Sequence, residues 1–220
     1  MNSIANTAID AFVLYADEKT MMTLSQLKEE PLVRNIYVMM KGGEECPCKG
    51  CEVIRVDDYR SSATIRKMTE ALKAPFALLC TAQTPVTFGY QAISRMCSVA
   101  SSVDSAVVYA DRYVVKNGET TKCPTMDFYY GSVRDDFDFG SVSLFSAETL
   151  RSYMEEFPSV NYCYSGWYDL QLFALRRKRR SALFHLREYL YTEEELDLRT
   201  SGEKQFDYVD PRNRAVQVEM

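Results

Sequence analysis

Aspartates that follow or interrupt apolar runs are the side chains in this sequence best suited to metal or phosphate chemistry. They are Asp57 and Asp58 in "VDDY", Asp111 in "YADRY", Asp135, Asp136 and Asp138 in "VRDDFDFG", and Asp169 in "WYDL". Acids at strand ends hold Mg²⁺ or Mn²⁺ against a diphosphate, because hard cations prefer oxygen ligands and leave positions to substrate phosphates. The competing interpretation of each pair is a turn, in which Asp hydrogen-bonds to its own backbone.

Cysteines and the single histidine are weaker candidates. Cys46, Cys48 and Cys51 in "CPCKGC" would supply most of a tetrahedral zinc site, but no second Cys or His pair follows at finger spacing. The sequence therefore favours a reduced surface loop. His185 lies on an apolar strand pattern with no Ser or Cys nucleophile in a local motif beside it, which favours a hydrogen-bonded, half-buried residue over a base.

The run "RRKRR" at residues 176–180 has two interpretations. One is a phosphate-binding site, because arginine forks suit phosphate. The other is a solvated helix C-terminus, where the helix dipole favours cations. The solvated helix end is the better fit. The sequence holds no P-loop, GxGxxG, nucleophile elbow or HExxH motif.

Composition narrows the class of protein. The chain has 220 residues, 46% of them hydrophobic, which is enough to bury a full core. A net charge of -5 argues against nucleic acid as the main partner. No stretch approaches the roughly 20 apolar residues of a transmembrane segment, and the N-terminus lacks the features of a signal peptide. Together with seven cysteines, an odd number, these features predict a cytoplasmic protein.

Strands and helices alternate along the first half of the chain. Apolar runs predict strands at residues 11–16, 35–40, 51–56, 75–80 and 105–115. Helical spacing separates them except between the second and third strands, which the cysteine loop joins, and Ser62 is an expected cap of the second helix. The helical positions are Met21, Leu24 and Leu27, then Ile65, Met68 and Leu72, then Ile93, Met96, Cys97 and Ala100. This order predicts an α/β domain with a mostly parallel central sheet, helices on both faces, and a ligand crevice beyond the carboxyl ends of the strands.

The second half reads as more β-like. Residues 128–133 and 139–145 are candidate strands, and Ser146 is expected to cap a helix. A further helix is expected from Trp167 to Leu175, followed by a strand or hairpin at residues 182–192. We expect one domain over residues 1–191 and a charged extension over residues 192–220 that continues into further sequence.

Three segments carry a resemblance to a known family. "VVYADRYVVKNG", "GSVRDDFDFGSVSLF" and "YSGWYDLQLFALRRKRRSALFHLREYLYT", with the order of elements, resemble family 2 glycosyltransferases of the GT-A, Rossmann-like fold, and more closely a bacterial subgroup with the "FDFG" segment. The resemblance covers residues 8–192. It implies transfer of a sugar from a nucleotide-diphosphate donor to a glycan acceptor, with inversion and usually with Mg²⁺ or Mn²⁺.

The family's site residues carry over only in part. The first strand ends in "LYADE", which leaves Asp17 or Glu18 as nucleotide contacts, and the second ends in "MMKGG" in place of Asp-Asp-Gly. The metal-binding Asp-x-Asp falls on "CTAQ", where a divalent ion loses its anionic anchors. The remaining assignments are Asp169 as catalytic base and Asp17, Asp57, Asp58 and Asp111 as nucleotide contacts, with no metal ligand assigned.

Three functions stay open at this point. The first is a working sugar transferase with a metal-independent or rewired site. The second is a glycosyltransferase-like domain without catalysis, acting as a binding or scaffolding module beside an active transferase domain beyond Met220. The third is an unrelated α/β interaction domain. The losses at the nucleotide and metal positions favour the second over the first.

Overall fold

The computed structural model describes residues 7–43, 45–129, 137, 139–177, 182–195 and 218–219. Its helices are α1 (Thr20–Glu29), α2 (Ser62–Ala71), α3 (Ala92–Val103), α4 (Ala147–Glu156) and α5 (Gly166–Arg177). Its strands are β1 (Ile9–Leu14), β2 (Val33–Met40), β3 (Glu52–Arg55), β4 (Phe76–Cys80), β5 (Val86–Phe88), β6 (Val107–Lys116), β7 (Glu119–Cys123), β8 (Val142–Ser146) and β9 (Leu183–Glu194).

The strands form one mixed sheet in the order β3-β2-β1-β4-β8-β6-β9-β5, and β7 pairs with β6. Pairings are parallel from β3 to β4 and between β6 and β9. They are antiparallel where β8 sits between β4 and β6, and at β7 and β5. The predicted α/β class is confirmed, and its parallel character is concentrated in the first four strands.

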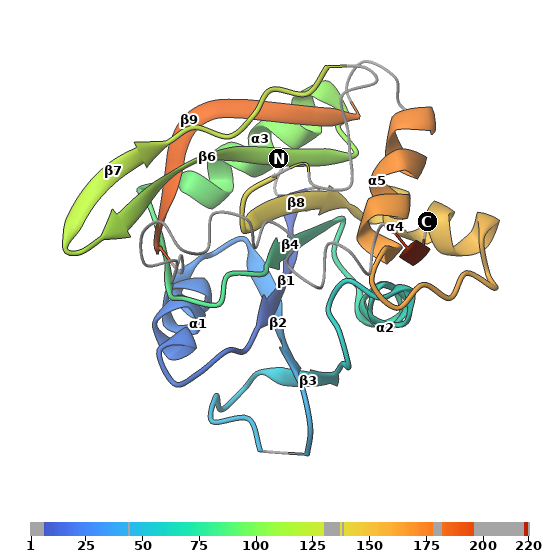
Figure 1. The fold of residues 1–220 in the computed structure, drawn as a ribbon, viewed down its shortest axis with the longest axis horizontal. Coiled ribbons are helices and arrows are strands. Elements are labelled where there is room, and N and C mark those ends of the chain that lie inside the picture. The colour runs from blue at the N-terminus through green and yellow to red at the C-terminus, as the bar shows by residue number, and fades with distance from the viewer. Residues whose placement is uncertain are drawn as a thin grey trace.

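Helices cover both faces of the sheet, as predicted (Figure 1). On one face α1 and α3 bury apolar side chains such as Leu24 and Met96. On the other face α2, α4 and α5 bury Ile65, Leu150 and Phe173. Every residue of β1 and β4 is buried, which is typical of strands with helices on both sides.

Serine side chains cap α2 and α4, and the cap of α2 lies one residue before the predicted position. Ser146 caps α4, its hydroxyl accepting from the amide of Thr149, as predicted. The cap of α2 is Ser61 rather than the expected Ser62, and its hydroxyl accepts from the amide of Thr64. Ser61 has the extended backbone of a cap, whereas Ser62 is the first helical residue.

Several elements differ from the sequence prediction. β5 and β7 were not predicted, and β9 is one long strand that continues past Thr192 to Glu194. The Asn117-Gly118 pair, with φ of 52° and 82°, forms the tight turn that joins β6 to β7. Residues 130–136, 138 and 178–181 lie outside the described residues, so the acids of "VRDDFDFG", the expected strand at 128–133 and most of "RRKRR" are not placed.

The cysteine loop between β2 and β3 is not fully reduced, contrary to expectation. Cys48 and Cys51 form a disulfide, while Cys46 is a free thiol. The Cα atoms of the pair lie 5.8 Å apart, within the usual range for a disulfide, and this proximity within a tight turn allows the bond. Among the described helices, none has the length and apolar character needed to span a bilayer.

Candidate functional site

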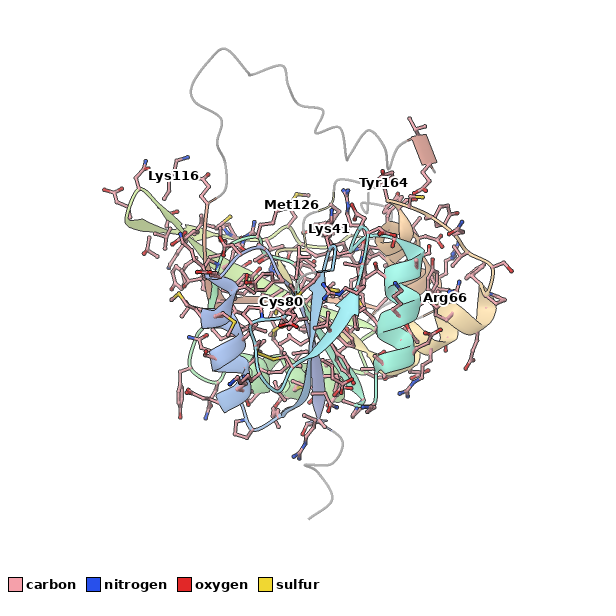
Figure 2. The ribbon with its side chains drawn as sticks, turned by 90° about the horizontal axis from the view of Figure 1, so that it is seen from below. Lys41, Arg66, Cys80, Lys116, Met126 and Tyr164 are labelled. Atoms are coloured by element: carbon pink, nitrogen blue, oxygen red, sulfur yellow. A yellow bond between two sulfur atoms is a disulfide. The ribbon has the colours of Figure 1, made fainter. Side chains whose placement is uncertain are left out.

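A hollow of about 660 Å³ opens where β1, β2 and β4 end and the loop after β3 begins. We call it the β1–β2 hollow. Its lining residues are Leu14, Tyr15, Ala16, Met40, Lys41, Gly42, Gly43, Asp58, Tyr59, Arg60 and Gln83. The carboxyl edge of parallel strands is where open α/β sheets bind ligands. Figure 2 shows Lys41 and Tyr164 at one edge of the molecule, with Cys80, the last residue of β4, in the interior.

Two cations and one carboxylate set the charge of this hollow. Arg60 binds Asp58 through both ends of its fork, with Nε–Oδ1 at 3.1 Å and Nη2–Oδ2 at 3.2 Å. Burial raises the pKa of Asp58, but the hydrogen bonds from Arg60 outweigh it and hold that pKa below its ordinary value. Asp58 is therefore ionised, and with exposed Lys41 the described lining residues carry a net charge of +1. That sign suits a phosphate group.

Two tyrosine rings flank Arg60, and of these Tyr59 lines the hollow. The guanidinium carbon lies 5.8 Å from the ring centre of Tyr59 and 5.8 Å from that of Tyr164. Aromatic faces of this kind stack on bases and sugars, while an adjacent arginine binds phosphate. At Gly42 and Gly43 a Cβ atom would meet no atom within 4 Å, so the turn after β2 leaves its backbone accessible.

The wall of the hollow at Arg60 is rigid because the start of α2 is bound to the start of α5. The amide of Ser62 donates to the carbonyl of Tyr162 at 2.9 Å, and the amide of Trp167 donates to the carbonyl of Arg60 at 3.2 Å. The indole nitrogen of Trp167 donates to the carbonyl of Tyr59. Gly166 packs directly on this backbone. These contacts fix the backbone of residues 59–62, which carries Arg60.

Of the four predicted nucleotide contacts, Asp58 alone lines the β1–β2 hollow. Asp57 is its exposed neighbour. Asp17 is exposed in the loop between β1 and α1, where its Oδ1 accepts from the amide of Lys19 at 2.8 Å in an Asx-type turn. Both acids lie beyond the strand ends as the sequence predicts, but neither is a lining residue.

Asp111 lies elsewhere, buried on β6 with 5% exposure. Its Oδ1 accepts from the amide of Thr125 at 2.8 Å and lies 2.8 Å from Nε2 of His185. The other ring nitrogen of His185 lies 2.6 Å from Asp127, and the ring stacks on Tyr109 at 4.8 Å. His185 is thus hydrogen-bonded on both sides, and the cluster ties β6 to β9 and to the loop after β7.

We expect Asp111→Ala to lower the free energy of unfolding by about 1–3 kcal/mol, because it leaves buried donors without their acceptor. Urea unfolding measures this loss. Binding of UDP should be unchanged, since Asp111 does not line the β1–β2 hollow. A folded Asp111→Ala protein that no longer binds UDP would instead restore Asp111 as a nucleotide contact.

Asp169, the predicted base, lies in the first turn of α5. Its Oδ2 accepts from the hydroxyl of Tyr153 at 2.7 Å. Burial and this hydrogen bond raise the pKa of Tyr153 above its ordinary value, so Tyr153 remains a donor. Asp169 lines a separate hollow of about 400 Å³ that includes Tyr162 and Arg176. The structure therefore does not bring Asp169 and Asp58 into one hollow.

The "CTAQ" segment borders a second large hollow, also about 660 Å³, which we call the β6–β7 hollow. The amide of Thr81 donates to the carbonyl of Ser141 at 2.8 Å, and Gln83 lines both large hollows. Within the β6–β7 hollow Arg112 pairs with Glu193 at 2.6 Å, and the hydroxyl of Ser141 donates to the same carboxylate. Glu193 is a carboxylate of this second hollow that the sequence pattern did not single out.

Lys41 and Arg60 were also missed. Each follows a strand by a few residues, in "MMKGG" and "VDDYR", and that position at the carboxyl edge is the signal that would have identified them.

The resemblance implies Mg²⁺ or Mn²⁺, and the residues around the β1–β2 hollow do not fit such an ion. Thr81, Ala82 and Gln83 offer no anionic oxygen after β4. Asp58 is already bound by Arg60. Within the described part of the chain no group of three or more His, Cys, Asp or Glu residues is arranged to hold a metal ion.

No known family profile matches this sequence. No curated protein matches it either. Solved structures do match. S. aureus TarS 1-349 in complex with UDP-GlcNAc has a TM-score of 0.58 and 12% identity over 96% of this chain and 66% of that one. Mannosyl-3-phosphoglycerate synthase from Rubrobacter xylanophilus has a TM-score of 0.54 and 10% identity, covering 98% of this chain and 75% of that one.

A third similar structure is 4-diphosphocytidyl-2C-methyl-D-erythritol synthase from Anaerococcus prevotii, with a TM-score of 0.51, 8% identity and 99% coverage of both chains. This chain spans 60% and 66% of two solved TarS chains. At these identities the likeness shows the fold, which is that of GT-A glycosyltransferases and related nucleotidyltransferases.

Proposed function

We propose that this chain is a glycosyltransferase-like domain that binds a nucleotide-diphosphate sugar in the β1–β2 hollow without a divalent ion. The observation that carries the proposal is the pair of cations, Lys41 and Arg60, in a hollow at the carboxyl edge of the parallel strands. Together with ionised Asp58 they give a net charge of +1, which would offset part of the charge of a bound diphosphate. Support for the ligand class comes from TarS, a structural neighbour solved with UDP-GlcNAc.

We assign the domain binding rather than sugar transfer. Inversion at a sugar carbon needs a carboxylate base near the donor. The carboxylate that lines the β1–β2 hollow, Asp58, is bound by Arg60, and Asp169 lines a different hollow with its oxygen on Tyr153. This arrangement supports a module that holds a nucleotide-sugar or presents it to an active partner domain.

Calorimetric titration with UDP, GDP and UDP-GlcNAc, each with and without Mn²⁺, tests the proposal. We expect micromolar binding of at least one nucleotide, with a Kd that Mn²⁺ changes by less than about threefold, or about 0.7 kcal/mol. The UDP-GlcNAc samples should release no UDP above the rate without protein. Absence of heat with every nucleotide would reject binding, and binding that requires Mn²⁺ would reject the metal-free site.

A further inference from the structure

Three successive backbone amides immediately before α5 converge on one carboxylate. The carboxylate of Glu219 accepts from the amides of Tyr164 at 2.8 Å and Ser165 at 2.9 Å, and from the hydroxyl of Ser165 at 2.8 Å. The amide of Cys163 donates to the same group. Consecutive amides that point at one anion form a nest, the geometry proteins use for phosphate and carboxylate. Here the anion comes from a residue 54 or more positions away.

The donors are held in place by contacts that do not involve Glu219. Tyr162 and Trp167, on either side of the three donors, are hydrogen-bonded to the backbone at the start of α2. The 12-residue helix α5 adds its positive N-terminal dipole. The concave set of donors is therefore built into the packed part of the fold.

Within the described part of the chain, the hydrogen bonds that hold the occupant are those of its carboxylate. Val218, beside Glu219, is 81% exposed. Figure 1 shows this short segment next to α5. Burial raises the pKa of Glu219, but the hydrogen bonds from Cys163, Tyr164 and Ser165 outweigh it and lower that pKa, so the group is an anion.

We propose that the amides of Cys163, Tyr164 and Ser165, with the Ser165 hydroxyl, form an anion-binding site for a phosphate or carboxylate group, and that Glu219 is its tethered, exchangeable occupant. This site is separate from the β1–β2 hollow and does not depend on nucleotide binding there. Its ligand would lie close to that hollow, because the Tyr164 ring and the Arg60 guanidinium are in contact. An occupant from the same chain competes at an effective concentration that an external ligand must exceed.

Removing the occupant tests the site directly. Inorganic phosphate and, in a second arm, acetate are titrated into Glu219→Ala at ionic strength held constant with chloride, while ¹⁵N spectra follow the amides of residues 163–165. We expect phosphate to shift these amides, with half-saturation at a concentration at least about tenfold lower than in the unmodified chain. Val218→Ala is the matched control, and it should behave like the unmodified chain. A stronger response to acetate than to phosphate would assign the site to carboxylates.

Two further variants keep the test decisive. Glu219→Gln, which keeps the shape and removes the charge, replaces Glu219→Ala if the alanine variant does not fold. Ser165→Ala combined with Glu219→Ala removes one donor and should raise the phosphate concentration needed for half-saturation. The proposal fails if neither anion shifts the three amides in a folded Glu219 variant, or if both proteins respond at the same concentration. UDP is absent from every sample, so this outcome is independent of nucleotide binding.

Discussion

Arg60→Ala is expected to weaken UDP binding at least about tenfold in calorimetric titration, because it removes one of the two positive charges that line the β1–β2 hollow. The substitution also leaves Asp58 without its partner, and the charge of the β1–β2 hollow falls from +1 to zero. A diphosphate would then meet an unpaired carboxylate beside it. The lost attraction of Arg60 and the added repulsion of Asp58 both weaken UDP binding.

Two variants control for this effect. Arg60→Lys keeps the charge but loses the planar fork, so its affinity for UDP should be intermediate. Arg66→Ala removes an arginine from α2 that does not line the hollow and that donates to the carbonyl of Val160 at 3.3 Å. It should bind UDP normally. If Arg60→Ala binds UDP as tightly as the unmodified chain, the nucleotide site lies outside this hollow.

Gly166→Ala should lower the free energy of unfolding by about 3 kcal/mol, an effect typical of overpacking. A Cβ atom at Gly166 would lie 2.6 Å from the amide nitrogen of Ser62, 2.8 Å from the carbonyl oxygen of Arg60 and 2.9 Å from the carbonyl carbon of Ser61. All three are backbone atoms at the start of α2, so no side-chain rotation relieves the clash. The urea midpoint should fall with little change in the slope of the transition.

Gly43→Ala is the matched substitution for Gly166→Ala. A Cβ atom at Gly43 would have no atom within 4 Å, so its urea midpoint should stay close to that of the unmodified chain. An unchanged midpoint for Gly166→Ala would mean that the starts of α2 and α5 are not in contact. The claim that this contact fixes the backbone at Arg60 would then be wrong.

The sequence predicted those strands and helices whose own residues show an apolar run or apolar residues at helical spacing. β1 and β4 are short apolar runs, and α2, α3 and α4 have buried residues at helical spacing. β7, with the sequence ETTKC, is almost entirely exposed, and β5 is three residues long. β7 is a strand because it pairs with β6 across the Asn117-Gly118 turn, and β5 is a strand because it pairs with β9, which is distant in sequence.

The candidate site was predictable in its position but not in its charges. The carboxyl edge of the early strands and Asp58 followed from the pattern of apolar runs ending in polar turns. Asp111 lies within an apolar run rather than at its end, and its partner His185 is 74 residues away, so its burial in a structural cluster could not be predicted from local sequence. Lys41 and Arg60 each look like ordinary surface cations until the fold brings them into one hollow.

Because β6 pairs with β9, which comes much later in the chain, this part of the sheet can be completed only late in folding. β6 spans Val107–Lys116, and its neighbour on one side is Leu183–Glu194. During synthesis β6 therefore leaves the ribosome well before the strand that completes its hydrogen bonds. Until then its unpaired edge is open to strands of other chains. Contacts of this separation also slow folding, so the final assembly of the sheet should be the step most exposed to aggregation.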